Sequence, residues 1–257
     1  MTALVTGGTG TLGRRVVRGL VARGRPTVVL TRSVDAPIPE GATRIVGDLT
    51  TGEGLGEALA AADVVFHCAT DGRRHRAVDD AGTTRLLQAA RRAGGPLIVY
   101  PGIVGSDVIP LGYYRSKQAA ETAIARSGLD WIVLRATQFH QLVWWRLERS
   151  SARPVMVIPR DTRAQPVDPT AVANALVDAG EGATRGRLSD LGGPTVYTAK
   201  DLAGSYLAAT GKKRRAIQIT YPGIVGAAFR AGGNLTPERD TTGATWNEFV
   251  ARRMTDR

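Results

Sequence analysis

Short β-branched runs alternate with helical stretches along the first two-thirds of the chain. Such alternation is typical of a parallel sheet that is covered by helices on both faces. The predicted strands are Ala3–Thr6, Thr27–Thr31, Thr43–Val46, Val64–His67, Leu97–Tyr100 and Trp131–Arg135. The predicted intervening helices are Leu12–Arg23, Gly54–Ala61, Thr83–Ala93 and Tyr113–Arg126. The pattern therefore predicts an α/β fold with a doubly wound parallel sheet.

A glycine-rich turn connects the first predicted strand to the first predicted helix. It reads Thr6-Gly7-Gly8-Thr9-Gly10-Thr11-Leu12-Gly13. Glycines at these spacings permit a tight turn, a close approach of the backbone to a diphosphate, and close packing of the helix on the strand. The free N–H groups of the helix then bind the diphosphate. In this context the turn predicts a Rossmann-type dinucleotide site, with Gly7, Thr9, Gly10, Thr11, Leu12 and Gly13 as its residues.

The end of the second strand indicates which dinucleotide is bound. An NAD-binding protein usually places a carboxylate there for the ribose 2′-hydroxyl. This chain has Arg32 and Ser33 instead, and its first carboxylate in that segment is Asp35. A cation fits a 2′-phosphate, so we expect NADP(H) to be preferred over NAD(H). Arg14, directly after the glycine turn, is a second candidate for that phosphate.

The pattern becomes looser after about Gln138. A strand is predicted at Val155–Ile158, and helices are predicted at Pro169–Asp178, Asp201–Thr210 and Trp246–Met254. We find no clear linker, so we expect residues 1–257 to form a single domain. Roughly residues 138–257 would then contribute a small C-terminal cap on the substrate side.

Composition narrows the class of protein. The 257 residues are 43% apolar and 22% charged, as in soluble globular proteins. Cys68 is the one cysteine, the start of the chain lacks secretory-signal features, and no apolar run approaches the ~20 residues of a membrane span. We therefore expect a cytoplasmic protein without a membrane anchor. The sequence does not indicate its oligomeric state.

The net charge of +11 raises the question of nucleic acid. The basic residues are mostly scattered arginines, and the one run, Lys212-Lys213-Arg214-Arg215, has no aromatic residue between its members. A nucleic-acid stacking platform needs such aromatic residues. We therefore expect a solvated basic surface and no nucleic-acid partner.

Tyr113 and Lys117 are four residues apart on a predicted helix, so their side chains share one face. An ammonium beside a phenol stabilises the phenolate, which suits the phenol to proton transfer. In a carbonyl reduction, Tyr113 would protonate the nascent alkoxide, and Lys117 would also hold the ribose hydroxyls. Tyr114 is the competing candidate if the helix is rotated from this register.

Several segments together resemble the atypical short-chain dehydrogenase/reductases. The likeness is to the NmrA-like group of NAD(P)-binding proteins, which are often labelled sugar-nucleotide epimerase-like, and it covers essentially the whole chain. The matching segments are the glycine turn, Gly47-Asp48-Leu49, Tyr113-Tyr114-Arg115-Ser116-Lys117, Leu134-Arg135-Ala136-Thr137-Gln138-Phe139-His140, Gln165-Pro166-Val167-Asp168 and Leu191-Gly192-Gly193-Pro194.

The resemblance implies further cofactor contacts. It implies that Asp48 and Leu49 lie beside the adenine. It also implies that Cys68, Ala69 and Thr70, after the fourth strand, lie along the cofactor. A further group of residues is implied to lie near the nicotinamide. The members of that group are Ala136, Thr137, Gln138 and Phe139.

One position departs from the family pattern. Short-chain reductases usually carry Ser or Thr after the fifth strand, where it holds the substrate carbonyl together with the tyrosine. This chain has Gly102 there, and Ser106 lies further along. The partner of the carbonyl oxygen is therefore missing, supplied by water, or replaced by a residue such as Gln138 or His140.

The remaining candidates are histidines, a cysteine and tryptophans. No histidine pair has metal-ligand spacing and Cys68 has no sulfur partner, so we expect no metal. His67 is interpreted as a core residue, and Cys68 as a small core hydrophobe rather than a nucleophile. His140, Trp144 and Trp145 are candidates for the substrate pocket, and one of the tryptophans is expected to be core.

Three functions are compatible with these residues. The leading one is an NADP(H)-dependent oxidoreductase that reduces a ketone, a quinone or a similar apolar carbonyl compound, with Tyr113 and Lys117 as its catalytic pair. The second is a non-catalytic NADP(H)-binding redox sensor of NmrA type, which Gly102 favours. The third is a sugar-nucleotide epimerase with tightly held NAD, which Arg32 disfavours.

Overall fold

The computed structural model describes residues 1–236 and 242–256. Residues 237–241 and 257 of the predicted substrate-side portion lie outside the described residues. The chain divides into two compact units. Unit 1 comprises Met1–Gly102, Gly112–Arg135 and Val172–Leu188, and unit 2 comprises Ile103–Leu111, Ala136–Ala171 and Ser189–Arg257.

Unit 1 is built on a seven-stranded sheet with the strand order β3-β2-β1-β4-β5-β6-β9. The pairs β1–β2, β1–β4, β2–β3, β4–β5 and β6–β9 are parallel. The strands are β1 (Ala3–Thr6), β2 (Thr27–Thr31), β3 (Thr43–Val46), β4 (Val64–His67), β5 (Leu97–Ile103), β6 (Trp131–Ala136) and β9 (Gly186–Arg187). The strand order reverses between β1 and β4, which is where open α/β sheets bind their ligands.

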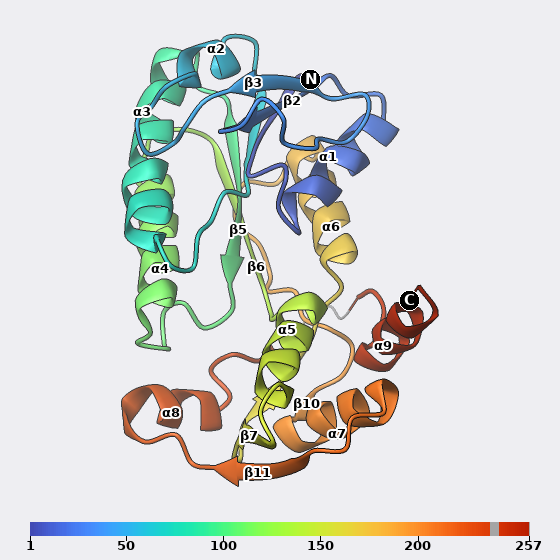
Figure 1. Cartoon of the computed structure of the whole chain (residues 1–257). Helices are drawn as coiled ribbons and strands as arrows, with labels where there is room; N and C mark the ends of the chain where they lie inside the picture. The colour runs from blue at the N-terminus through green and yellow to red at the C-terminus, as the bar shows by residue number, and fades with distance from the viewer. Residues whose placement is uncertain (237–241, 257) are drawn as a thin grey trace. The chain divides into compact units, whose positions relative to one another are not determined.

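Helices cover both faces of this sheet. Figure 1 shows α1 and α6 on one side and α2, α3 and α4 on the other. The helices are α1 (Gly13–Ala22), α2 (Leu55–Leu59), α3 (Thr83–Arg92), α4 (Gly112–Ala125) and α6 (Pro169–Glu181), with a π-helical segment η1 (Arg76–Gly82) directly before α3. In α3 the apolar face predicted from Leu86, Leu87 and Ala90 is buried. Alternate apolar positions of the strands, among them Leu4, Val65 and Ile98, form one core cluster with those of α2, α3 and α4.

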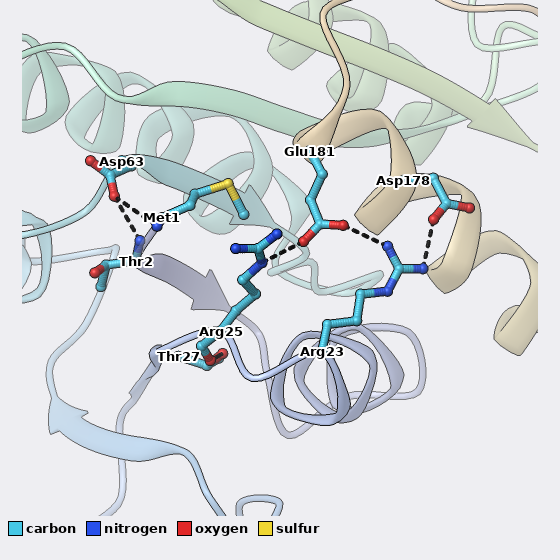
Figure 2. Close-up of polar contacts among 8 residues, drawn as sticks. All are labelled: Met1, Thr2, Arg23, Arg25, Thr27, Asp63, Asp178 and Glu181. Atoms are coloured by element: carbon cyan, nitrogen blue, oxygen red, sulfur yellow. Dashed lines mark hydrogen bonds and ion pairs between the residues drawn. The ribbon is translucent and has the colours of Figure 1, made fainter.

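Four charged residues fasten α6 to the end of α1. Arg23 binds Asp178 at 2.6 Å and Glu181 at 2.8 Å, while Arg25 binds Glu181 at 2.7 Å (Figure 2). The two arginines hold the pKa of Glu181 below its usual value. Beneath these pairs the helices approach closely, because Gly19 of α1 lies beside Val177 of α6. The start of β1 is also held by a polar contact, because Asp63 accepts a hydrogen bond from the backbone N–H of Thr2.

Unit 2 contains two short two-stranded sheets and four helices among its described residues. β7 (Val155–Pro159) pairs in parallel with β11 (Arg215–Ile219), and β8 (Arg163–Ala164) pairs antiparallel with β10 (Tyr197–Thr198). The helices are α5 (His140–Ser151), α7 (Ala199–Thr210), α8 (Gly223–Arg230) and α9 (Trp246–Thr255). Capping boxes begin α7 at Thr198 and Asp201 and α9 at Thr245 and Glu248.

An aromatic cluster forms the core of unit 2. The Trp144 ring of α5 packs on Tyr206 of α7, with ring centroids 4.8 Å apart, and on Trp246 and Phe249 of α9. Trp144 is 2% exposed, whereas its neighbour Trp145 is 49% exposed. The expectation that one tryptophan is a core residue is therefore confirmed for Trp144.

The predicted fold class is confirmed, because unit 1 is a doubly wound parallel sheet with helices on both faces. The predicted strands agree with those observed to within a few residues, the largest difference being that β5 runs on to Ile103. The π-helical η1, the short strands β8, β9 and β10, the strand β11 and the helix α8 were not predicted. The assignment of residues 138–257 to the substrate side stays a prediction.

Within the described residues, no helix is long and apolar enough to cross a membrane.

Replacing the two adjacent tryptophans separates core packing from surface contact. We expect Trp144→Ala to lower the free energy of unfolding by about 3–5 kcal/mol, because it opens a cavity among three aromatic rings. Trp145→Ala should change it by less than about 1 kcal/mol, since half of that side chain is in water and it stacks under Arg149. Denaturant unfolding of both variants measures the difference, and equal losses would contradict this assignment of the core.

Candidate functional site

The glycine turn after β1 has the close approaches that a dinucleotide cradle needs. Gly7 has a φ of +67°, and a Cβ there would lie 2.6 Å from the backbone of Ala69, which follows β4. A Cβ at Gly13 would overlap the carbonyl oxygen of Gly7. The Gly10 N–H donates to that same oxygen at 2.9 Å and closes the turn. Glycine is therefore required at both ends of the turn, as the sequence predicts.

The N-terminus of α1 opens at this turn without competing acidic groups. Leu12, the N-cap residue, makes no side-chain cap, and the first turn of α1 carries no acidic residue within the described chain. Arg14 donates to the carbonyl oxygen of Thr9 at 2.8 Å, and Arg15 donates to that of Thr11 at 2.6 Å. The positive end of the helix and these two guanidinium groups suit a diphosphate.

The ends of β2 and β3 carry the residues expected at the adenosine. Arg32 is exposed, and the Ser33 hydroxyl accepts from the Asp35 N–H at 3.3 Å. Burial disfavours ionisation of Asp48, but hydrogen bonds from Thr50 and the charges of Arg32 and Arg74 outweigh it and lower the pKa of Asp48. Arg32 and Asp48 therefore share one electrostatic neighbourhood. Leu49 is 7% exposed and belongs to the core cluster.

Tyr113 and Lys117 share one face of α4, as predicted. The Tyr113 hydroxyl lies 3.0 Å from Thr70 Oγ1, and Lys117 Nζ lies 5.9 Å from the centre of the Tyr113 ring. Tyr114 is buried at 7% exposure, whereas Tyr113 is only partly buried. Tyr113 is thus the tyrosine that can reach both solvent and Thr70.

The sequence did not reveal the partner of Lys117. Lys117 Nζ lies 3.1 Å from Asp79 Oδ1, and the two side chains are 4% and 0% exposed. Burial acts to lower the pKa of Lys117, but Tyr100, Tyr113 and Asp79 outweigh that effect and raise it. Asp79 lies in the π-helical η1, and nothing local in Asp79-Asp80 distinguishes it from a surface residue. The interaction depends on how η1 packs against α4.

The end of β4 is a buried polar junction. His67 is fully buried, and its Nδ1 and Nε2 bond Thr6 Oγ1 at 2.7 Å and Thr83 Oγ1 at 2.9 Å. Burial, with the charge of Lys117, lowers the pKa of His67 to about 3, so its ring is neutral. The interpretation of His67 as a satisfied core residue is confirmed. Burial raises the pKa of the Cys68 thiol to about 12, so it is not a thiolate nucleophile.

The structure gives a physical reason for Gly102. A Cβ at this position would overlap Glu121 Oε1 and lie 2.8 Å from Arg135 Cγ. Glu121 and Arg135 form a buried ion pair with an N–O distance of 2.7 Å, and Arg135 also donates to Gln118 at 2.8 Å. A serine at 102 would have to displace this pair. Gly102 therefore leaves room for a buried salt bridge.

The residues predicted near the nicotinamide lie in unit 2. Ala136 and Thr137 are buried, and the Thr137 hydroxyl donates to the Gln165 carbonyl oxygen at 2.6 Å. Gln138 donates to the Asn234 carbonyl oxygen at 3.0 Å and accepts from the Gln165 N–H at 3.3 Å. Phe139 is the N-cap residue of α5. Their contact with a nicotinamide stays a prediction.

The candidate substrate residues differ in their surroundings within unit 2. His140 is 1% exposed and stacks on Phe249 with ring centroids 5.0 Å apart. Burial lowers the pKa of His140 to about 4, so its ring is neutral at pH 7. Trp144 belongs to the aromatic core, while Trp145 is exposed beneath Arg149. Their role in binding a substrate stays a prediction.

The described residues contain no group of three or more His, Cys, Asp or Glu side chains arranged to hold a metal ion.

Residues 7–180 match the model of a protein family described as NAD(P)H-binding. Among curated proteins, sterol demethylase protein B of Methylococcus capsulatus is 30% identical over 198 residues, which cover 72% of this chain and 59% of that protein. A photosystem II assembly factor of Synechocystis is 35% identical over 149 residues, covering 55% of this chain and 46% of that protein. A dihydroquinoline-oxide ketoreductase of Stigmatella aurantiaca is 43% identical over 103 residues, or 36% and 30% of the two chains. This chain thus matches less than two thirds of each relative.

Solved structures agree over nearly the whole chain. The NADPH complex of a quinone oxidoreductase from Escherichia coli has a TM-score of 0.82 at 19% identity, covering 98% of this chain and 99% of that one. Triphenylmethane reductase from Citrobacter has a TM-score of 0.83 at 18% identity, covering 99% and 100%. At such identities the likeness shows the fold alone.

Restoring the family hydroxyl should destabilise this protein. We expect Gly102→Ser to lower the free energy of unfolding by about 1–3 kcal/mol, because the new Cβ is forced against the Glu121–Arg135 pair. Denaturant unfolding measures the loss. The control is Gly56→Ser in α2, where a Cβ meets nothing within 4 Å and stability should be unchanged or slightly higher. If Gly102→Ser is as stable as the control, the steric account is wrong.

Proposed function

Since this chain belongs to the NAD(P)H-binding family, of the NmrA-like, atypical short-chain dehydrogenase/reductase type, we propose that it is an NADP(H)-dependent oxidoreductase. Its substrate is a ketone, a quinone or a similar apolar carbonyl compound. The observation that carries the proposal is the position of Tyr113. Gly7 packs against Ala69, and the next residue, Thr70, contacts the Tyr113 hydroxyl at 3.0 Å. The glycine cradle and the proton donor thus meet at the same end of β4.

Different residues of unit 1 carry out different parts of such a reaction. The N-terminus of α1 binds the diphosphate, and Lys117 adds a buried positive charge beside the ribose position and below Tyr113. When bound, the reduced nicotinamide supplies a hydride to the carbonyl carbon. Tyr113 gives its hydroxyl proton to the carbonyl oxygen, so that the alkoxide never accumulates. Because Tyr113 is only partly buried, solvent can return its proton.

Arg32 supports the choice of NADP(H). It stands at the end of β2, where a 2′-hydroxyl would call for a carboxylate, and its charge already lowers the pKa of Asp48. Arg74 acts on the same aspartate, so two cations lie in this neighbourhood. A phosphate binds two guanidinium groups well.

A non-catalytic redox sensor is the second candidate. Gly102 supports it, because the hydroxyl that usually assists the tyrosine is absent and a side chain there would displace Glu121. The name of the Synechocystis relative describes an assembly factor and not a reductase. A sensor would bind both redox forms of the nucleotide and consume neither, so turnover separates the two functions.

Cofactor preference can be tested by titrating NADPH and NADH by fluorescence. We expect NADPH to bind more tightly, and Arg32→Ala to weaken NADPH binding by roughly ten- to a hundredfold while leaving NADH unchanged. Arg126→Ala removes one positive charge from an exposed site at the far end of α4 and serves as the control. Equal binding of both nucleotides to the wild type would contradict the preference. If neither binds, both proposed functions fail.

Turnover can be tested with NADPH and two flat carbonyl probes, 1-tetralone and 9,10-phenanthrenequinone. We expect Tyr113→Phe to lower kcat for the ketone by roughly 100- to 10,000-fold with unchanged NADPH binding, because the general acid is lost. Tyr221→Phe, an exposed tyrosine of unit 2, is the matched control. NADPH binding without turnover of either probe would favour the sensor.

A further inference from the structure

A buried carboxylate that the proposed reaction has not yet used lies below Tyr113. The Asp79 side chain is 0% exposed. Its Oδ1 receives the Lys117 ammonium at 3.1 Å and the Thr70 hydroxyl at 2.8 Å. Its Oδ2 accepts from the Asp71 N–H at 3.3 Å. Thr70 in turn lies 3.0 Å from the Tyr113 hydroxyl, so one polar chain joins Tyr113, Thr70, Asp79 and Lys117.

The direction of the hydrogen bonds in this chain follows from counting hydrogens. A threonine hydroxyl has one hydrogen, and an ionised carboxylate only accepts. Thr70 gives its hydrogen to Asp79, so it can only accept from Tyr113. The Tyr113 hydroxyl is therefore held as a neutral donor. Without an acceptor at Asp79, Thr70 would be free to rotate and Tyr113 would lose its fixed orientation.

The surroundings of Lys117 show which group balances its charge. Lys117 faces Tyr100 at 4.9 Å from the ring centre, Tyr113 at 5.9 Å and the neutral His67, while Cys68 remains a thiol. Asp79 is the anion among these groups, so it balances the buried ammonium.

We propose that Asp79 is a positioning residue of the site, which keeps Lys117 charged below Tyr113 and orients the Tyr113 hydroxyl through Thr70. This inference rests on the proposed function. In the proton transfer, the Tyr113 hydrogen first turns from Thr70 to the carbonyl oxygen, and then the Tyr113 O–H bond breaks as the O–H bond of the product alcohol forms. Thr70 then turns its hydrogen from Asp79 to the phenolate, while Asp79 keeps its contacts with Lys117 and the Asp71 N–H. Solvent later returns a proton to Tyr113 and Thr70 turns back.

A chemical test needs neither cofactor nor substrate. Tetranitromethane nitrates tyrosine through its phenolate, and peptide mapping gives the rate at Tyr113 alone. We expect Asp79→Asn to accelerate this nitration at least about tenfold, because the ammonium is left without its anion. Thr70→Val, which keeps the ion pair, should slow it roughly fivefold, because the phenolate loses the hydrogen bond that Thr70 donates to it and this is the factor that an ordinary hydrogen bond represents. It also serves if Asp79→Asn does not fold.

One control variant of the nitration test removes the same charge as Asp79→Asn, and the other keeps the hydroxyl of Thr70. Asp80→Asn removes the same charge one residue further along, from a side chain outside the Tyr113–Thr70–Asp79–Lys117 chain, and should leave the rate unchanged. Thr70→Ser keeps the hydroxyl and should restore the wild-type rate. Unchanged or slower nitration in a folded Asp79→Asn, or unchanged or faster nitration in Thr70→Val, would overturn the inference.

A kinetic test uses NADPH with 1-tetralone. We expect Thr70→Val to lower kcat about tenfold with little change in KM, and Thr70→Ser to recover most of the loss. In a Tyr113→Phe background Thr70→Val should have no further effect, because its effect passes through the hydroxyl of Tyr113. An equal loss in both backgrounds would refute the positioning role. If instead Tyr113→Phe turns over normally, the proposed function fails, and nitration alone decides the role of Asp79.

Discussion

The buried ammonium of Lys117 sets the conditions for the rest of the site. A charge with 4% of its side chain exposed is stable only beside a compensating charge, and Asp79 provides it from a side chain that is wholly buried. The pair joins α4 to the π-helical η1, and Thr70 extends it to the loop after β4. π-Helical turns are rare in proteins, but many of those that occur lie at functional sites. Here the π-helical turn carries Asp79, the acidic side chain that pairs with Lys117.

A second buried ion pair, between Glu121 and Arg135, lies one helical turn further along α4. Tyr113, Lys117 and Glu121 are spaced by four residues, so all three belong to one face of the helix. Tyr100 and Gly102 are two residues apart on β5, so they share one face of the strand. Lys117 lies over the Tyr100 ring, and Glu121 fills the space beside Gly102. The missing hydroxyl and the buried Glu121–Arg135 pair are thus two aspects of one packing arrangement.

The sequence predicted what is encoded locally and missed what depends on distant partners. The glycine turn follows from steric needs within a few residues, and the Tyr113–Lys117 pair follows from helix periodicity alone. Asp79 could not be predicted, because its partner is 38 residues away and the π-helical register of η1 decides which side chain turns inward. The two-residue strands β8, β9 and β10 carry no periodicity, and β11 is exposed along its whole length, so it lacks the alternation that indicates a strand.

The difference between an enzyme and a sensor in this family therefore depends on how the proton of Tyr113 is handled. Without a hydroxyl at 102, Tyr113 must itself bind the carbonyl oxygen and protonate it, so its orientation has to be fixed from behind. Thr70 and Asp79 fix this orientation. When Tyr113 ionises, Thr70 can donate its hydrogen to the phenolate instead of to Asp79, and this stabilises the phenolate as it forms. A buried ion pair placed under a solvent-accessible phenol suits the proposed reaction, because it fixes a positive charge near the group that ionises. The same pair joins α4 to η1, so turnover is what separates the two proposed functions.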